Sequence, residues 1–228
     1  MQISKMDYNR ILLPIITLLV VIMTYTMPAS AKVCYVNSAA VEGGDTGQSW
    51  THAYLTLQSA LLNYECDEIW VAKGVYRPVT PVDPQHVTDN ERRESFVILS
   101  SMKVYGGFRG TESTILQRDP QSYLTVLSGD IDQNDVLTAN NTQLSASIRG
   151  GNSYHVIRID GSSGIPITES TIVDGFAVTG GNADGDPYST QPDASGGGLY
   201  CDGHGHTFGN EACNPLIENM LFYGNRAK

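Results

Sequence analysis

Basic residues are scarce in this sequence of 228 residues. It contains 14 Lys and Arg against 24 Asp and Glu, which gives a formal net charge of −10 at pH 7. Nucleic acids and anionic membrane surfaces both require a basic stripe or patch on the protein that binds them. The composition therefore argues against both classes of partner, and the excess of acidic residues favours solubility.

The sequence also lacks the common motifs of nucleotide-dependent and hydrolytic enzymes. It contains no nucleophile elbow, phosphate-binding Gly loop, zinc-binding helix or dinucleotide fingerprint. Pairs such as Gly106-Gly107 are typical of turns. We therefore expect no cofactor, with calcium as a possible ion.

Long hydrophobic runs are absent except near the N-terminus. Lys5 and Arg10 precede the apolar residues 11–23, which contain Pro14. This run is shorter than the roughly 20 residues that span a bilayer. The small residues 29–31, Ala-Ser-Ala, follow where a signal peptidase would cleave.

We interpret residues 1–31 as a cleaved secretory signal and residues 32–228 as one domain without a stable membrane span. An uncleaved membrane anchor is the alternative. A lipoprotein is excluded, because Cys34 follows Lys32-Val33 rather than small residues.

The four cysteines all lie after the signal. An even number of cysteines in an exported chain is typical of disulfides. Sequence alone allows three connectivities, and we favour Cys34 with Cys66 and Cys201 with Cys213, because each pair lies within one local segment. The second pair has two histidines between its cysteines, so a metal site or free thiols are its alternatives.

The chain repeats itself near its C-terminal end. Residues 172–183, IVDGFAVTGGNA, return 44 positions later as residues 216–227, LIENMLFYGNRA. A unit of one strand and one turn cannot bury its apolar face alone, so we expect copies to stack as a solenoid of parallel strands. We interpret residues 182–195 as an excursion loop within one coil, and two plain coils is the alternative. The residues expected to face inward are Ile172, Phe176 and Val178, which match Leu216, Met220 and Phe222.

One helical pattern interrupts the strands. Apolar residues recur at helical spacing between Trp50 and Leu61, which predicts an amphipathic helix over residues 51–62. Ser49 or Thr51 could cap its start. Such a helix could cover the open first coil of a solenoid, and packing against its side is the alternative.

The remaining apolar runs predict strands separated by polar loops, with no second helix of length between them. The architecture is therefore not built from βαβ units. The expected strands are 33–36, 68–72, 96–99, 103–105, 125–128, 154–159, 171–179, 199–201 and 215–223.

Four blocks then occur in a specific order: EIWVAKGVYRP (68–78), VYGGFRGTE (104–112), QRDP (117–120) and VLSGDID (126–132). This succession resembles the N-terminal part of bacterial secreted right-handed parallel β-helix proteins, the pectin-lyase-like group that includes relatives of polymorphic outer membrane proteins. The resemblance covers nearly all of the mature chain. It implies an all-β, right-handed parallel β-helix with an N-terminal capping helix.

The resemblance also implies a longer protein, with more Gly-Gly-Gly-x-Tyr coils and a C-terminal sorting or anchoring region. We therefore expect this chain to be an N-terminal fragment whose last coil is uncovered. An uncovered, strand-edged apolar end should make the fragment self-associate.

Two oxygen-rich clusters are candidate calcium sites. The candidate ligands are Asp130, Asp132 and Asn134 in the first cluster, and Asn182, Asp184 and Asp186 in the second. In the first, Asp135 stands where an EF-hand needs Gly, and Asn141 stands where it needs Glu. A turn that its own Asx side chains satisfy is the better-supported alternative.

We expect no catalytic residue, and two side chains are candidates if there is one. Arg158 lies between two isoleucines that should point inward, which leaves it outside, where the base of a polysaccharide lyase could act. His204 belongs to a Gly-His-Gly tripeptide found in polygalacturonases, whose Asn-Thr-Asp and Asp-Asp elements are absent here. A solvated surface charge and a coincidence are the simpler explanations.

These observations predict a protein that is secreted or held at the bacterial outer membrane. It would act as a non-catalytic scaffold in adhesion or in binding extracellular polysaccharide or a surface protein. The alternatives are a polysaccharide lyase or glycoside hydrolase of the same fold, and a structural spacer in a longer adhesin. Two acids and one base on one outer face within a cleft would favour the enzyme, whereas a face of only Asn, Ser, Thr and Gly would exclude it.

Overall fold

The computed structural model describes residues 31–41, 45–140, 142–203 and 213–228, and residues 31–228 form one compact unit. Its helices are short: α1 (Leu57–Leu61), α2 (Asp89–Arg92) and the 3-10 turn η1 (Ile115–Gln117). The strands are β1 (Val33–Val36), β2 (Glu68–Ala72), β3 (Gly74–Tyr76), β4 (Phe96–Leu99), β5 (Lys103–Phe108), β6 (Thr125–Ser128), β7 (Val136–Leu137), β8 (Ser145–Ser147), β9 (Ile157–Asp160), β10 (Ile172–Asp174), β11 (Phe176–Thr179), β12 (Asn182–Ala183), β13 (Leu199–Asp202), β14 (Leu216–Glu218), β15 (Leu221–Tyr223) and β16 (Arg226–Ala227).

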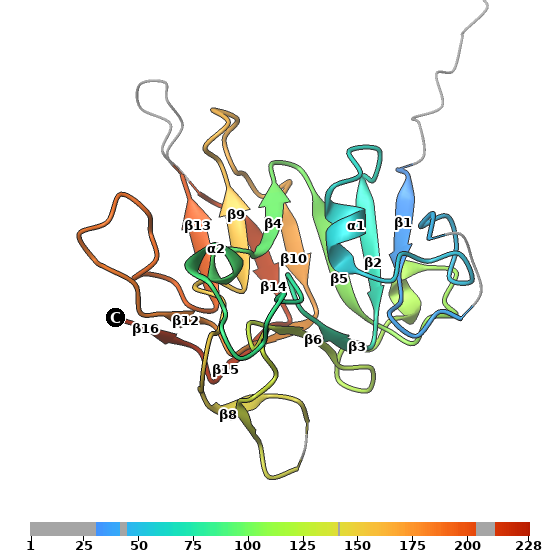
Figure 1. The fold of residues 1–228 in the computed structure, drawn as a ribbon. Helices are drawn as coiled ribbons and strands as arrows, with labels where there is room; N and C mark the ends of the chain where they lie inside the picture. Colours follow the sequence, from blue (N-terminus) through green and yellow to red (C-terminus); the bar gives the residue numbers. More distant parts are fainter. Residues whose placement is uncertain (1–30, 42–44, 141, 204–212) are drawn as a thin grey trace, which may run out of the picture. The chain divides into compact units, whose positions relative to one another are not determined.

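In the described part of the chain, most strands belong to three parallel sheets (Figure 1). Sheet A has the order β1-β2-β5-β10-β14, sheet B has β3-β6-β11-β15, and sheet C has β4-β9-β13. The chain adds one strand to each sheet in turn, as in β2, β3, β4 and again in β10, β11, β13. The fold is therefore all-β with mostly parallel pairing, as the sequence predicted.

The repeat in the sequence corresponds to the strand register. Ile172 pairs with Leu216 in sheet A, and Ala177 pairs with Leu221 in sheet B. Each pair is 44 positions apart, which is the spacing of the repeated segments. Residues 184–198 form a loop before β13, but the predicted excursion loop 182–195 begins too early, because Asn182 and Ala183 form β12 and pair with β16.

The predicted inward face is correct in β11 but wrong in β10. Phe176 and Val178 belong to the main core, whereas Val173, and not Ile172, faces that core. Ile172 packs instead on an aromatic cluster on the outside of sheet A. Gly175, with φ of +86°, separates the two strands, and this left-handed turn breaks the alternation that a single strand over 171–179 would keep.

The helix α1 is shorter than the predicted 51–62. Its cap is Thr56, whose hydroxyl accepts from the Ser59 amide at 3.2 Å. The preceding residues follow β1 instead, because the Tyr54 amide donates to the Tyr35 carbonyl at 2.8 Å. The helix contacts β4 and β1, which are edge strands of sheets C and A, and buries Leu57 among its three core residues.

Two disulfides join the pairs that the sequence favoured, Cys34 with Cys66 and Cys201 with Cys213. The first ties β1 to the turn before β2. Because all four cysteines are oxidised, the thiolate ligands of a metal site between Cys201 and Cys213 are excluded. None of the helices in the described ranges is long and apolar enough to cross a membrane.

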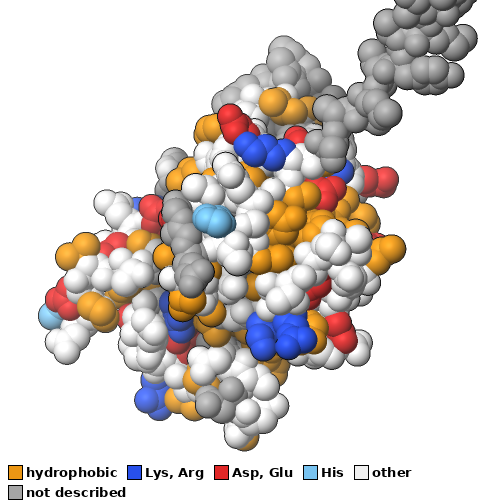
Figure 2. Space-filling model, turned by 90° about the vertical axis from the view of Figure 1, so that its right-hand side faces the viewer, with side chains coloured by type: hydrophobic (Ala, Val, Ile, Leu, Met, Phe, Trp, Pro, Cys, Tyr) orange, Lys and Arg blue, Asp and Glu red, His pale blue; other side chains and the backbone are white. Residues whose placement is uncertain are grey.

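Figure 2 shows the face of the molecule at the β1 end. On its described part, hydrophobic side chains cover much of the surface, and the Lys and Arg side chains form separate small groups. An outer aromatic cluster on sheet A is built from Trp70, Tyr105 and Phe108, with Tyr35 and Trp50 partly exposed beside it. Because this aromatic cluster covers the outer face of sheet A, the sheet is buried on both of its faces.

Candidate functional site

The outer face of sheet C carries two carboxylates and a guanidinium. In β9 the core residues Ile157 and Ile159 are fully buried, which leaves Arg158 and Asp160 on the outside, as predicted for Arg158. The same alternation puts Tyr200 and Asp202 of β13 on that face. Register pairs Arg158 with Tyr200 and Asp160 with Asp202.

Arg158 is held between the two carboxylates. Its Nη2 lies 3.3 Å from Asp202 Oδ2 and 3.7 Å from Asp160 Oδ2. Burial by itself raises the pKa of Asp160, but hydrogen bonds from Ser162 and the charge of Arg158 bring it below its usual value. At neutral pH this is an ionised, paired carboxylate rather than a proton donor.

The Tyr200 ring is supported from one side by His155. The two rings stack with centroids 5.0 Å apart at 26°. His155 is 4% exposed, its Nδ1 lies 3.2 Å from the Gly196 carbonyl, and burial lowers its pKa, so it is neutral at pH 7. Its Nε2 is buried without a hydrogen-bond partner among the described residues. Tyr200 is thereby fixed in orientation.

A pocket of about 640 Å³ opens beside Tyr200. The loop after β12, Tyr200 and Asp202 of β13, and Lys228 line it. Polar and proline side chains dominate the loop wall: Pro187, Ser189, Thr190, Gln191, Pro192 and Ser195. A concave site with both polar and apolar lining and one stacked aromatic ring is suited to a polyhydroxylated ligand.

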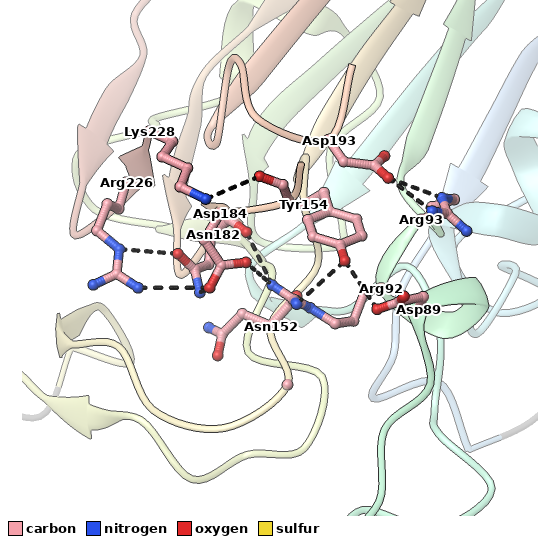
Figure 3. A network of polar contacts seen from close by, with 12 residues as sticks. Asp89, Arg92, Arg93, Asn152, Tyr154, Asn182, Asp184, Asp193, Arg226 and Lys228 are labelled. Carbon is pink, nitrogen blue, oxygen red and sulfur yellow. Dashed lines mark hydrogen bonds and ion pairs between the residues drawn. The ribbon is translucent and has the colours of Figure 1, made fainter. Parts of the chain in front are cut away.

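Two consecutive arginines at the end of α2 hold this loop in place (Figure 3). Arg92 donates to Asp184 at 2.5 Å and lies 4.1 Å above the Tyr154 ring. Arg93 donates to Asp193, which is 4% exposed, at 2.8 Å. The two contacts hold the loop near both of its ends, so the pocket wall is already formed in the folded protein.

The second calcium candidate is part of this arginine network. Asn182 Nδ2 donates to Asp184 at 3.0 Å, and Asn182 Oδ1 accepts from Arg226 at 3.0 Å. Asp184 also pairs with Arg92, whereas Asp186 is exposed and accepts from the amide of Tyr188. Guanidinium groups therefore occupy the positions around these oxygens that a cation would take.

The first candidate forms an Asx-rich turn. Asp130 Oδ1 accepts from the Asn134 amide at 3.0 Å, and Asp132 Oδ2 accepts from Asn134 Nδ2 and from the Gly151 amide, both at 2.8 Å. Asp132 Oδ1 is buried and has no partner in the described chain. Burial first, and then the nearby charge of Asp135, raises the pKa of Asp130 to about 6.

Within the ranges that the structure describes, no three His, Cys, Asp or Glu side chains are grouped to hold a metal ion. Calcium at either cluster thus stays a prediction from sequence, without geometric support. His204 lies outside the described residues. Arg158 is placed outward as predicted, and its guanidinium is paired with Asp160 and Asp202.

Sequence reasoning missed most of this site. Asp160, Tyr200 and Asp202 were not singled out, although alternation beside Ile159 and Cys201 marks all three as outward-facing. Arg93 and Asp193 are 100 residues apart, and no local pattern connects them. Comparison with family models, curated proteins and solved structures finds no match to this chain.

Proposed function

We propose that this protein is an exported scaffold of the right-handed parallel β-helix, pectin-lyase-like type, which binds extracellular polysaccharide without cleaving it. The solenoid is supported by three parallel sheets that each gain a strand per circuit, and by the 44-residue register. The two disulfides support an oxidising, extracytoplasmic location. In this interpretation α1 covers the first coil.

The observation that carries the proposal is the pocket beside Tyr200. Its wall combines an aromatic ring, fixed by stacking on His155, with hydroxyl, amide and carboxylate groups from the loop and β13. Sugars present apolar ring faces and many hydroxyls, so they match such a surface. The arginines of α2 hold the wall in place before a ligand arrives, which lowers the entropy lost on binding.

Binding is favoured over catalysis by the state of the carboxylates. A glycosidase needs one protonated and one ionised carboxyl group beside the bond that it cleaves. Here the pKa of Asp160 is lowered, and both Asp160 and Asp202 are paired with Arg158. With its lowered pKa, the Asp160 carboxyl group is ionised at neutral pH and does not serve as the general acid.

An enzyme remains the second candidate, because one observation favours it. Two acids and one base do lie on a single outer face, next to a pocket, which is the arrangement that the sequence analysis named for an enzyme. Glycosidic bond cleavage would also need a protonated carboxyl group as the general acid. That group would be one that becomes protonated when the substrate binds, or one from residues outside the described ranges.

The test is a retention and product assay on immobilised polysaccharides with the full, oxidised chain. We expect retention without new reducing ends and without the ultraviolet absorbance of unsaturated uronate. Tyr200→Ala should weaken retention at least about tenfold, whereas Tyr64→Ala, at a tyrosine that is 80% exposed elsewhere, should not. If the native chain forms product and Arg158→Ala does not, the enzyme hypothesis would replace the scaffold hypothesis.

A further inference from the structure

We propose that the pocket beside Tyr200 takes an uncharged saccharide rather than a uronate or another anionic polymer. This inference rests on the proposed function and adds the charge class of the ligand. Three observations support it: the arginines around the pocket are paired with carboxylates, the pocket lining is nearly neutral, and the chain has a negative net charge.

The guanidinium groups around the pocket are already neutralised by carboxylates. The pairs are Arg158 with Asp160 and Asp202, Arg93 with Asp193, and Arg92 and Arg226 with Asp184. A guanidinium recognises a sugar carboxylate by donating two parallel hydrogen bonds to it. Among the described residues, each arginine near this pocket already makes an ion pair with a carboxylate of the protein.

The lining itself is close to neutral. Among the described lining residues, Lys228 is the one cation and Asp202 the one anion, and Lys228 Nζ lies 3.4 Å from the Gly185 carbonyl. Hydroxyl and amide side chains of the loop supply donors and acceptors that carry no charge. The formal net charge of −10 adds a long-range repulsion toward polyanions.

The aromatic contact favours the same class. Tyr200 stacks on His155, which is neutral because burial lowers its pKa, so the stacked pair adds no positive charge beneath the ligand. The apolar face of a neutral pyranose can pack on such a ring with no cost from desolvating a carboxylate. Hydroxyls at its rim can then reach Asp202 and the loop.

The experiment compares three immobilised probes: a neutral mixed-linkage glucan, a neutral galactomannan and polygalacturonate. Each is tested at about 50 mM and about 500 mM NaCl, because screening weakens charge-driven binding over this range. We expect retention on at least one neutral probe that changes less than about twofold with salt. Retention on polygalacturonate should be at least about tenfold weaker.

Matched variants separate ring stacking from charge. Tyr200→Phe should keep neutral binding, and Tyr200→Ala should weaken it at least about tenfold. Lys228→Gln should change it less than about threefold, as expected for a ligand without charge. Asp202→Asn removes one of the carboxylates that neutralise Arg158, so it should increase retention on polygalacturonate.

The outcomes are distinguishable. Retention on polygalacturonate alone, lost in high salt and in Lys228→Gln, would overturn the neutral-ligand inference and leave the scaffold proposal standing. Retention on none of a wider panel of neutral and acidic polysaccharides would overturn the proposed function and this inference together.

Discussion

Asp130 should make the stability of this protein depend on pH in a direction opposite to most acidic residues. Its carboxylate is 3% exposed, accepts from the amides of Asn134 and Asp135, and lies near the buried Asp135 carboxylate. Asp135 cannot move away, because Ser145 Oγ and Asn152 Nδ2 donate to it at 2.5 and 3.0 Å. Burial and this neighbouring charge raise the pKa of Asp130 to about 6.

The sign follows from the raised pKa. The folded protein holds the Asp130 proton more tightly than the unfolded chain, whose pKa is near the usual 3.8. The contribution to the free energy of unfolding is therefore full below about pH 3.8 and is lost as the pH rises through about 6. The gap between these pKa values corresponds to about 3 kcal/mol, of which about 2 kcal/mol is lost between about pH 4.5 and pH 7.5.

The variant Asp130→Asn isolates this effect, because an amide keeps the acceptor oxygen but carries no charge. We expect urea unfolding to show the variant gaining about 2 kcal/mol relative to the native protein between about pH 4.5 and pH 7.5. His155, whose pKa burial lowers, destabilises the fold as the pH falls in both proteins and cancels in the difference. A difference that stays constant over this range would refute the buried carboxyl pair.

Three further predictions concern the scaffold. Gly175→Ala should lower the free energy of unfolding by roughly 1–3 kcal/mol, because its φ is +86° and an added Cβ would lie 2.9 Å from the Gly106 carbonyl oxygen. Gly164→Ala, with φ of +81° and open space around the Cβ, is the control that carries backbone strain alone, and equal losses would contradict the steric argument. Replacing Cys34 and Cys66 by Ala opens a link across 32 residues and should cost about 3–4 kcal/mol in urea unfolding, whereas an unchanged midpoint would show that the bond constrains little. Because Phe222 is 46% exposed at the edge of sheet B, this chain should self-associate in sedimentation experiments, and Phe222→Lys should reduce the association. A monodisperse native monomer would contradict this.

Strand positions could be predicted from sequence wherever the information is local. The strands 68–72 and 96–99 have the predicted bounds, because each is a short run of β-prone apolar residues between polar turns. The outward position of Arg158 follows from alternation and is confirmed by the burial of its neighbours. Period-two alternation survives folding because it is a property of the extended backbone itself.

Predictions from local patterns were wrong where tertiary contacts or a turn determined the backbone conformation. The helical spacing from Trp50 onward is real, but Tyr54 pairs with β1, so the helix begins only after Thr56. In β10 the positive φ at Gly175 reverses the face that the sequence assigns to Ile172. Both errors arise because competing hydrogen bonds and a left-handed turn are not visible in hydrophobic periodicity.

The candidate site depends on the strand register of sheet C, which differs from the spacing of the sequence repeat. In the last circuit, sheets A and B repeat after 44 residues, as from Ile172 to Leu216, but sheet C repeats after 42, from Ile157 to Leu199. The connection after β13 is therefore two residues longer than the one after β9, and Arg158 lies opposite Tyr200 instead of Asp202. An even difference keeps the outer face outside, whereas an odd one would have turned Tyr200 into the core. The position of Tyr200 beside Arg158 thus follows from the register of sheet C, which neither the repeat nor the alternation determines.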